Sequence, residues 1–321
     1  MVKIMLNNIL IVGGAGYIGG ITTDIFLKHN YKVTIYSNLL YEDSYRKYHK
    51  NLEFVYGDIR DREKLLIELN KSDAVIWLAA IVGDGACQIN PELTYEINTE
   101  SVKWLCENYN KRILFPSTCS VYGVQKEEGL LTEESETNPI SIYAESKLKA
   151  EKYLLDHKDS LIFRLGTVFG VGDQFSRIRM DLVVNTMVAK VFNHNKIKVY
   201  GGEQFRPLIS VNDIGNLFYK NIISSHNGIF NIAKENIKMI DLANKIKNIF
   251  PNCELEIEDM PFQDTRNYKV SNNKMRNILK FKPRFTIGDE IQKLWYLIST
   301  RRIKDVNNYK FINEKYLKEI L

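Results

Sequence analysis

The sequence is poor in the residues that build covalently linked or metal-held scaffolds. Its four cysteines show no CxxC spacing, and its five histidines are scattered without metal-ligand spacing. A chain of 321 residues buries enough apolar surface without such links. We therefore expect reduced thiols, no metal and a cytoplasmic protein.

Long apolar runs are also missing. No stretch is long enough for a membrane span, and Asn7 and Asn8 interrupt the apolar start, which lacks a cleavage site for a signal peptide. The net charge of +5 is modest, and no basic helix or basic–aromatic stripe accompanies it. These absences argue against a membrane or a nucleic acid as partner.

Short apolar segments alternate with longer amphipathic segments in the first half of the chain. Strands are predicted at 8–12, 32–36, 52–56, 74–80, 112–117 and 160–166, and helices at 17–29, 62–70, 91–109 and 143–157. Apolar runs without polar alternation are typical of strands buried on both faces of a parallel sheet. The pattern predicts an α/β fold with a doubly wound parallel sheet.

The alternation becomes less regular after Gly170. Helices are predicted at 176–192, 239–250 and 286–300, a strand at 228–233, and a helical tail at 301–321. No linker separates the two halves of the chain. We therefore expect a smaller mixed α/β lobe packed closely on the sheet, with a cleft between them.

Three glycines follow the first predicted strand. Gly13, Gly16 and Gly19 form GxxGxxG between this strand and an amphipathic helix. Such a turn lets backbone N–H groups face an anion, and the helix N-terminus adds partial positive charge. The position between strand and helix makes the pattern specific for phosphate binding.

A second pattern carries acid–base chemistry. Tyr143 and Lys147 lie four residues apart, on one face of a predicted helix. An ammonium group one turn away favours the phenolate, so the tyrosine can move a proton at neutral pH. Thr118 follows a predicted strand 25 residues before Tyr143, where its hydroxyl can bind the reacting oxygen.

Together, "GGAGYIG", "GDI" (57–59), "LAA" (78–80) and "YAESK" resemble the extended short-chain dehydrogenase/reductase family of NAD-dependent nucleotide-sugar epimerases and dehydratases. The resemblance covers most of the chain. It implies a dinucleotide-binding Rossmann domain at 1–165 and a substrate-binding lobe at 166–321, with some segments of the lobe returning to the sheet. It also implies a homodimer through the helices 91–109 and 143–157.

The resemblance implies that the pyrophosphate of NAD approaches the glycine turn. The implied cofactor contacts are Gly13, Gly16, Tyr17, Ile18, Gly19, Ser37, Asn38, Asp58, Ile59, Leu78, Ala79, Ala80, Asn98, Ser117, Tyr143 and Lys147. Ser37 stands where an acidic residue usually binds the ribose and repels a 2′-phosphate. We favour NAD, and NADP stays open because Ser37 lacks the carboxylate that discriminates between the two cofactors; Arg46 and Lys47 are nearby in sequence, but nothing fixes them near the ribose.

The implied substrate is a nucleoside-diphosphate sugar. Its contacts by resemblance are Thr118, Cys119, Thr167, Arg179, Asp181, Leu182, Tyr200, Arg206 and Arg266. Two of these, Arg206 and Arg266, correspond to arginines that hold the diphosphate, which suits the planar guanidinium. Arg177 and Arg179 are expected to open the helix 176–192.

The two residues after Thr118 distinguish between the reactions that the family catalyses. The family's 4,6-dehydratases carry an Asp–Glu pair there, whereas this chain has Cys119 and Ser120. Its 3,5-epimerising reductases place a cysteine where this chain has Ser120, and a one-residue offset turns Cys119 to the opposite face. The sequence therefore predicts a 4-epimerase acting by transient oxidation at C4.

Three alternatives remain open at this point. A C4 dehydrogenase or reductase is the runner-up, and a 4,6-dehydratase ranks below it. The non-enzyme alternative is a dinucleotide-binding sensor, which has no need for Thr118, Tyr143 and Lys147 together.

Overall fold

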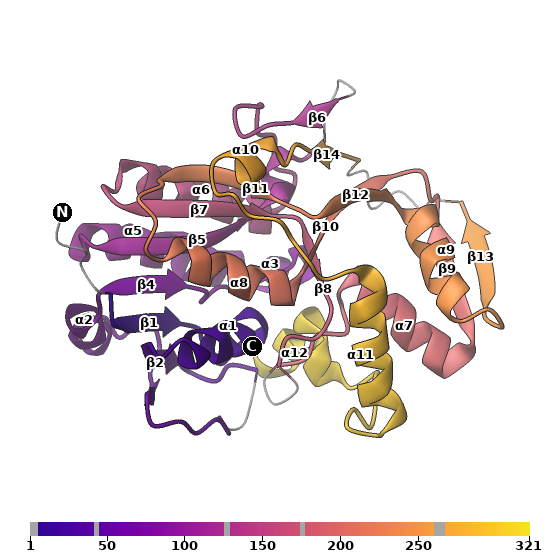
Figure 1. The fold of residues 1–321 in the computed structure, drawn as a ribbon, viewed down its shortest axis with the longest axis horizontal. Helices are drawn as coiled ribbons and strands as arrows, with labels where there is room; N and C mark the ends of the chain where they lie inside the picture. Colours follow the sequence, from indigo (N-terminus) through magenta and orange to yellow (C-terminus); the bar gives the residue numbers. More distant parts are fainter. Residues whose placement is uncertain (1–5, 42–44, 125–128, 174–176, 260–266) are drawn as a thin grey trace.

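A seven-stranded sheet forms the larger part of the molecule (Figure 1). The computed structural model describes residues 6–41, 45–124, 129–173, 177–259 and 267–321. The strand order is β11-β7-β5-β4-β1-β2-β3, and every neighbouring pair is parallel. The strands are β1 (Asn8–Val12), β2 (Lys32–Ser37), β3 (Leu52–Tyr56), β4 (Ala74–Trp77), β5 (Arg112–Thr118), β7 (Ser160–Leu165) and β11 (Gly228–Ile232).

Helices cover both faces of this sheet. In β1, Ile9 and Ile11 join an apolar cluster with α1 (Tyr17–Lys28) and α8 (Val211–Asn221). Leu10 and Val12 join a second cluster on the opposite face. The helices of that face are α2 (Arg62–Lys71), α5 (Ser101–Asn108) and α6 (Ile142–Asp156). The predicted doubly wound sheet, buried on both faces, is confirmed.

Within the sheet, β2 is the neighbour of β1 on one side and β4 is its neighbour on the other. The segments that leave β1 and β4 therefore diverge at the carboxyl edge of the sheet, which is where such folds bind ligands. The glycine turn follows β1, and residues 78–81 follow β4.

A smaller part carries three short sheets, at the right and top of Figure 1. Their strands are β8 (Thr167–Phe169), β10 (Phe205–Ser210) and β12 (Glu235–Lys238); β9 (Lys196–Tyr200) and β13 (Glu254–Glu258); and β6 (Leu130–Leu131) and β14 (Lys269–Val270). The helices α7 (Val183–His194), α9 (Met239–Ile249) and α11 (Ile287–Ser299) enclose a separate apolar core there. The predicted smaller mixed α/β lobe is confirmed, and α8 and β11 return from it to the large sheet.

The remaining elements are short. They are α3 (Asp84–Ile89), α4 (Pro91–Tyr95), η1 (Glu96–Glu100), η2 (Cys119–Tyr122), α10 (Asn273–Asn277), η3 (Tyr309–Phe311) and α12 (Asn313–Ile320). Within the described ranges, no helix is both long and apolar enough to cross a membrane.

Three predicted helices differ from the structure. The helix expected at 91–109 is α4, the π-helical turn η1 and α5, because η1 lets Asn98 bond the segment after β4. The helix expected at 176–192 begins only at Val183, because polar contacts of Arg177 and Asp181 hold the preceding residues in a non-helical path. In the tail 301–321, only α12 and η3 are helical.

Candidate active site

Two adjoining cavities lie at the carboxyl edge of the sheet, where the segments that follow β1 and β4 diverge. The smaller cavity has a volume of about 200 Å³ and the larger one about 550 Å³. Residues that line both are Gly13, Gly16, Tyr41, Leu78, Ala80 and Arg177. The glycine turn thus forms the boundary between the cavities.

The three glycines of this turn serve different purposes. Gly13 has φ +79° and a Cβ there would lie 2.6 Å from the Ala79 nitrogen; a Cβ on Gly19 would lie 2.3 Å from the Gly14 oxygen. The protein's own backbone requires these two glycines. Gly16 differs, since a Cβ there meets only the Gly13 oxygen at 3.2 Å. Its φ of −79° suits any residue, so a ligand explains Gly16 better than packing does.

The electrostatics of the turn fit an anion. Helix α1 begins at Tyr17 without an acidic residue in its first turn, so its positive end is not neutralised locally. Tyr17, Ile18 and Gly19 line the larger cavity. The residues present therefore fit the pyrophosphate of a dinucleotide.

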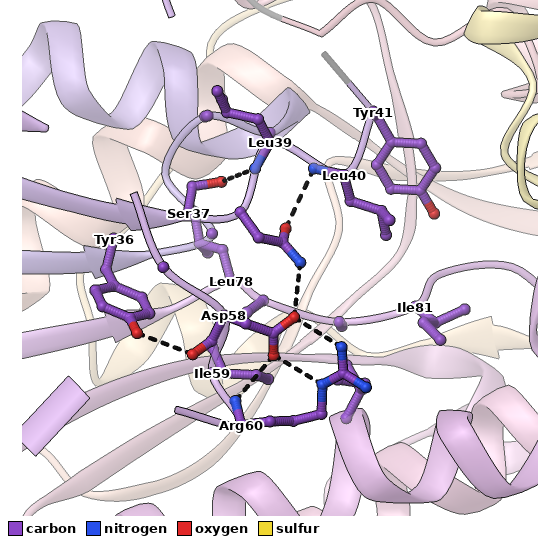
Figure 2. Close-up of a pocket in the computed structure, with 18 of the residues that line it drawn as sticks. Tyr36, Ser37, Leu39, Leu40, Tyr41, Asp58, Ile59, Arg60, Leu78 and Ile81 are labelled. Atoms are coloured by element: carbon purple, nitrogen blue, oxygen red, sulfur yellow. Dashed lines mark hydrogen bonds and ion pairs between the residues drawn. The ribbon is translucent and has the colours of Figure 1, made fainter. Parts of the chain in front are cut away.

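The smaller cavity is lined by residues that are expected to contact the cofactor (Figure 2). Ser37, Asn38, Asp58, Ile59, Leu78, Ala79 and Ala80 all line it. Arg60 donates to both carboxylate oxygens of Asp58 at 2.9 Å, and Asn38 donates to one of them at 3.1 Å. The Arg60 hydrogen bond is the main reason that the pKa of Asp58 falls to about 2.

Ser37 lines this cavity, and its Oγ accepts a hydrogen bond from the Leu39 nitrogen at 3.3 Å. Arg46 and Lys47 line neither cavity. The ammonium of Lys47 instead pairs with Asp24 at 2.5 Å and with Asp173 at 2.6 Å. The Lys47 ammonium is therefore paired with two carboxylates outside the cavities and supplies no charge for a ribose 2′-phosphate.

The three predicted catalytic residues line the larger cavity together. Thr118 ends β5, and Tyr143 and Lys147 lie one turn apart on α6. Ser141 begins this helix by accepting a hydrogen bond from the Ala144 nitrogen. The cap fixes the start of α6 directly before Tyr143.

Burial controls the titration of Tyr143 and Lys147. It raises the pKa of Tyr143 well above 10, against the opposing effects of the Arg179 charge and a hydrogen bond with Thr118. It lowers the pKa of Lys147 to about 7, against the opposing charge of Glu151. In this environment burial outweighs the expected fall in the Tyr143 pKa.

A buried ionic network lies behind the catalytic residues. The Ser117 hydroxyl, which also lines the larger cavity, donates to Glu151. Arg164 donates to the Glu151 carboxylate at 2.8 Å, and both side chains are almost fully buried. The network ties the end of β5 to α6 and so fixes Thr118 relative to Tyr143.

Five predicted substrate residues besides Thr118 line the larger cavity: Thr167, Arg179, Asp181, Leu182 and Arg206. Arg179 and Asp181 form a two-point ion pair, with distances of 2.9 and 3.0 Å. Arg266 lies outside the described residues.

Three predicted contacts reach neither cavity. Cys119 is buried with its Sγ 3.1 Å from the Arg164 carbonyl oxygen, so it faces away from the cavity. Tyr200 is exposed on β9, with the Lys198 ammonium 5.5 Å from its ring centre. The Asn98 amide bonds the Ile81 backbone instead. The structure therefore places these three side chains outside the lining of both cavities.

Some cavity residues were missed by the sequence analysis. They include Tyr41, Arg60, Ile81, Asp84, Asn313, Leu317 and Leu321. None belongs to a motif, and the last three come from a tail whose role no local pattern indicated. Among the described residues, no group of three or more histidine, cysteine or acidic side chains could hold a metal.

The sheet, the glycine turn and the Thr–Tyr–Lys set define a dinucleotide-dependent α/β enzyme. Residues 9–233 match the NAD dependent epimerase/dehydratase family, and the chain belongs to this family. It is therefore an NAD-dependent enzyme whose homologues are nucleotide-sugar epimerases and dehydratases.

Individual relatives differ in their reactions. CDP-paratose 2-epimerase of Salmonella typhi is 25% identical and covers 89% of this chain and 98% of the relative. Putative UDP-arabinose 4-epimerase 4 of Arabidopsis thaliana is 31% identical over 47% of this chain and 38% of the relative. UDP-glucose 4-epimerase of Thermotoga maritima has the same fold, with a TM-score of 0.79 and 21% identity over 91% of this chain and 99% of that one.

Proposed function

We propose that the protein is an NAD-dependent nucleotide-sugar 4-epimerase. One observation carries the proposal. Thr118, Tyr143 and Lys147 share a cavity with the glycine turn, while the two residues after Thr118 supply no carboxyl group for an elimination. The set can oxidise a sugar hydroxyl and reduce the resulting ketone, but it lacks the dehydratase pair at its expected place.

In this proposal the adenosine half of the cofactor occupies the smaller cavity, and the nicotinamide and sugar occupy the larger one. The cofactor contacts are the predicted residues that line the cavities, without Asn98. NAD, when bound, accepts a hydride from the sugar carbon and returns it. The chain itself supplies the proton transfer and the orientation.

The positive charges of Lys147 and of bound NAD would favour the phenolate of Tyr143 against the effect of burial. The phenolate would take the proton of the C4 hydroxyl and later return it to the same oxygen. Thr118 donates a hydrogen bond to that oxygen, and Lys147 contributes positive charge one turn away from the phenolate. Arg206 and Arg179 offer guanidinium groups to the diphosphate. Epimerisation then requires the ketone to present its other face before hydride returns.

Two carboxylates do line the larger cavity. Asp181 is neutralised by its ion pair with Arg179, and Asp84 accepts a hydrogen bond from Ser141 at 2.6 Å. Neither follows Thr118 in the chain, where the dehydratases of the family carry their acid and base.

Two other reactions are the competing candidates. The match to a CDP-paratose 2-epimerase extends over nearly the whole relative and favours inversion at C2 as the second candidate. The same Thr–Tyr–Lys set would also serve a C4 dehydrogenase or reductase, in which the hydride leaves the enzyme.

We also propose a homodimer through the helical segment α4–α5 and through α6. The two pack together within one chain, where Tyr95 donates to Glu145 at 2.8 Å and Thr99 to the Ser146 carbonyl at 3.0 Å. Leu155 on α6 is an exposed apolar side chain that a second copy would cover. Sedimentation of the purified protein tests this proposal, and a monomer at micromolar concentration would overturn it.

The function is tested by product analysis with UDP-, GDP-, CDP- and dTDP-sugars. An isomer of unchanged mass, inverted at C4 by NMR, supports the proposal, and inversion at C2 supports the second candidate. A mass change of two hydrogens indicates a dehydrogenase or reductase, and loss of water a dehydratase. NAD binding without any turnover indicates a sensor.

A further inference from the structure

The end of the described chain forms a wall of both cavities. Leu317 and Leu321 line the smaller cavity, and Asn313 lines the larger one. In Figure 1, α12 (yellow) lies between α1 and α11. Leu317 is fully buried in a cluster with Ile81 and with part of α3. The partly buried Tyr143 packs against the same cluster, so α3 lies between α12 and the helix that carries Tyr143 and contacts both.

Arg177 holds α12 in this place. Its guanidinium donates to the Lys310 carbonyl and, at 2.8 Å, to the Asn313 side chain. It also lies 4.1 Å from the ring centre of Tyr41 and 6.0 Å from that of Tyr316. With only 3% of its surface exposed, Arg177 connects the segment before α7, the segment after β2 and α12.

Asn313 donates two further hydrogen bonds at the start of α12. Its backbone nitrogen donates to Asp181 at 2.9 Å, and its side chain donates to the Val82 carbonyl at 2.9 Å. The start of this eight-residue helix is therefore bound to the segments after β4 and before α7. Such a short helix needs these tertiary contacts, since isolated helices of its length are marginal in water.

The position of Arg177 also has an electrostatic consequence. Arg177 lines both cavities, as Gly13 and Gly16 do. The positive end of α1 and the guanidinium thus face the same junction between the cavities. An anion at this junction is attracted by both positive charges.

We propose that Arg177 and α12 form a latch that encloses the diphosphate and adenosine of bound NAD, so that release of the cofactor requires α12 to undock. The inference rests on the cofactor site of the proposed function but not on the sugar or the reaction. A retained cofactor suits an epimerase, which restores its NAD in each turnover.

The experiment measures release of NAD from the purified protein in the absence of any sugar. Radiolabelled NAD is bound, excess unlabelled NAD is added, and label retained on the protein is followed with time. The variants are Arg177→Met, Leu317→Ala and a deletion of residues 313–321. Lys318→Ala is the matched control, because Lys318 lies on α12, pairs with Glu314 and lines neither cavity.

We expect Arg177→Met and the deletion to release NAD at least tenfold faster than the wild type, Leu317→Ala severalfold faster, and Lys318→Ala at the wild-type rate. Wild-type release from folded Arg177→Met and Leu317→Ala proteins would overturn the latch. If Arg177→Met and the deletion variant do not fold, the rate of NAD release from the milder variant Leu317→Ala decides. A wild-type protein that binds no NAD would overturn the cofactor site itself, whereas absent epimerase activity leaves this measurement unaffected.

Discussion

The ammonium nitrogen of Lys147 lies 4.0 Å from the centre of the Phe115 ring. Phe115 belongs to β5 and Lys147 to α6, so the contact joins the strand that carries Thr118 to the helix that carries Tyr143. The ring stabilises the cation by a cation–π interaction, but it also excludes water from it. Burial prevails and lowers the pKa of Lys147 to about 7.

The first prediction follows from this pKa. Between pH 7 and 10.5, the unfolded chain binds more protons at Lys147 than the folded chain does. The contribution of Lys147 to the free energy of unfolding therefore increases as the pH rises through this range. Lys147→Met should therefore raise the free energy of unfolding most at pH 7 and below, and progressively less towards pH 10.5. Urea titrations of both proteins at pH 6.5 and 9 measure the difference. A difference that is the same at both pH values would contradict the assigned pKa.

The second prediction concerns Tyr143. Tyr143→Phe removes the hydroxyl that moves the proton and leaves the ring in place. We expect kcat to fall by a factor of order 10² or more, with NAD binding within a fewfold of wild type. Steady-state kinetics and calorimetry measure the two quantities. Activity within a fewfold of wild type would remove Tyr143 from the mechanism.

The third prediction separates the ligand-facing glycine from the structural ones. Gly16→Val should abolish NAD binding but keep the thermal unfolding midpoint close to that of the wild type, because φ at Gly16 is −79° and a Cβ there would meet a single atom, the Gly13 oxygen at 3.2 Å. Gly129→Val is the control, since no atom lies within 4 Å of a Cβ at that position. Retained NAD affinity in the Gly16 variant would mean that the turn serves packing alone.

The fourth prediction concerns the ribose. Ser37→Asp places a carboxylate in the smaller cavity, where it would repel a 2′-phosphate. Like charges brought together cost on the order of 1 kcal/mol or more, so the affinity for NADP relative to NAD should fall about tenfold. Ser299→Asp, at an exposed position on α11, adds the same charge as a control. An unchanged ratio of affinities would show that Ser37 does not face the ribose.

The fifth prediction concerns Cys119. Burial raises the pKa of its thiol far above 9, and the side chain faces away from the larger cavity. Cys119→Ala should therefore keep kcat within about twofold of the wild type and lower stability by about 1 kcal/mol. Kinetics and urea denaturation test both statements. A tenfold loss of kcat in a stable variant would restore Cys119 as an acid or base.

The residues of the candidate site that line the cavities could be picked out from the sequence because their signals are local. Gly13, Gly16 and Gly19 stand directly between a strand and a helix, and Tyr143 and Lys147 are one helical turn apart. Such spacings translate into geometry without knowledge of the rest of the fold. The six strands predicted in the first half were found for the same reason, since continuous apolar runs suffice to identify buried parallel strands.

Asn98 and Cys119 show what such signals leave open, namely the direction in which a side chain points. Both lie within segments that resemble the family, yet which way each side chain faces depends on partners elsewhere, the Ile81 backbone for Asn98 and the Arg164 carbonyl for Cys119. The π-helical turn around Asn98 likewise interrupts a segment whose apolar spacing predicts one continuous helix.

By itself, the sequence determined the doubly wound sheet, and it predicted the glycine turn and the Thr–Tyr–Lys set as candidate site residues, because each follows from short-range periodicity or from one fixed spacing. Only the tertiary structure decided which cationic side chains line the two cavities. Lys47 is near Ser37 in the chain but pairs with Asp24, whereas Arg177 reaches Asn313 across 136 residues. Contacts over such distances depend on the path of the backbone through the whole fold, and no local pattern encodes that path.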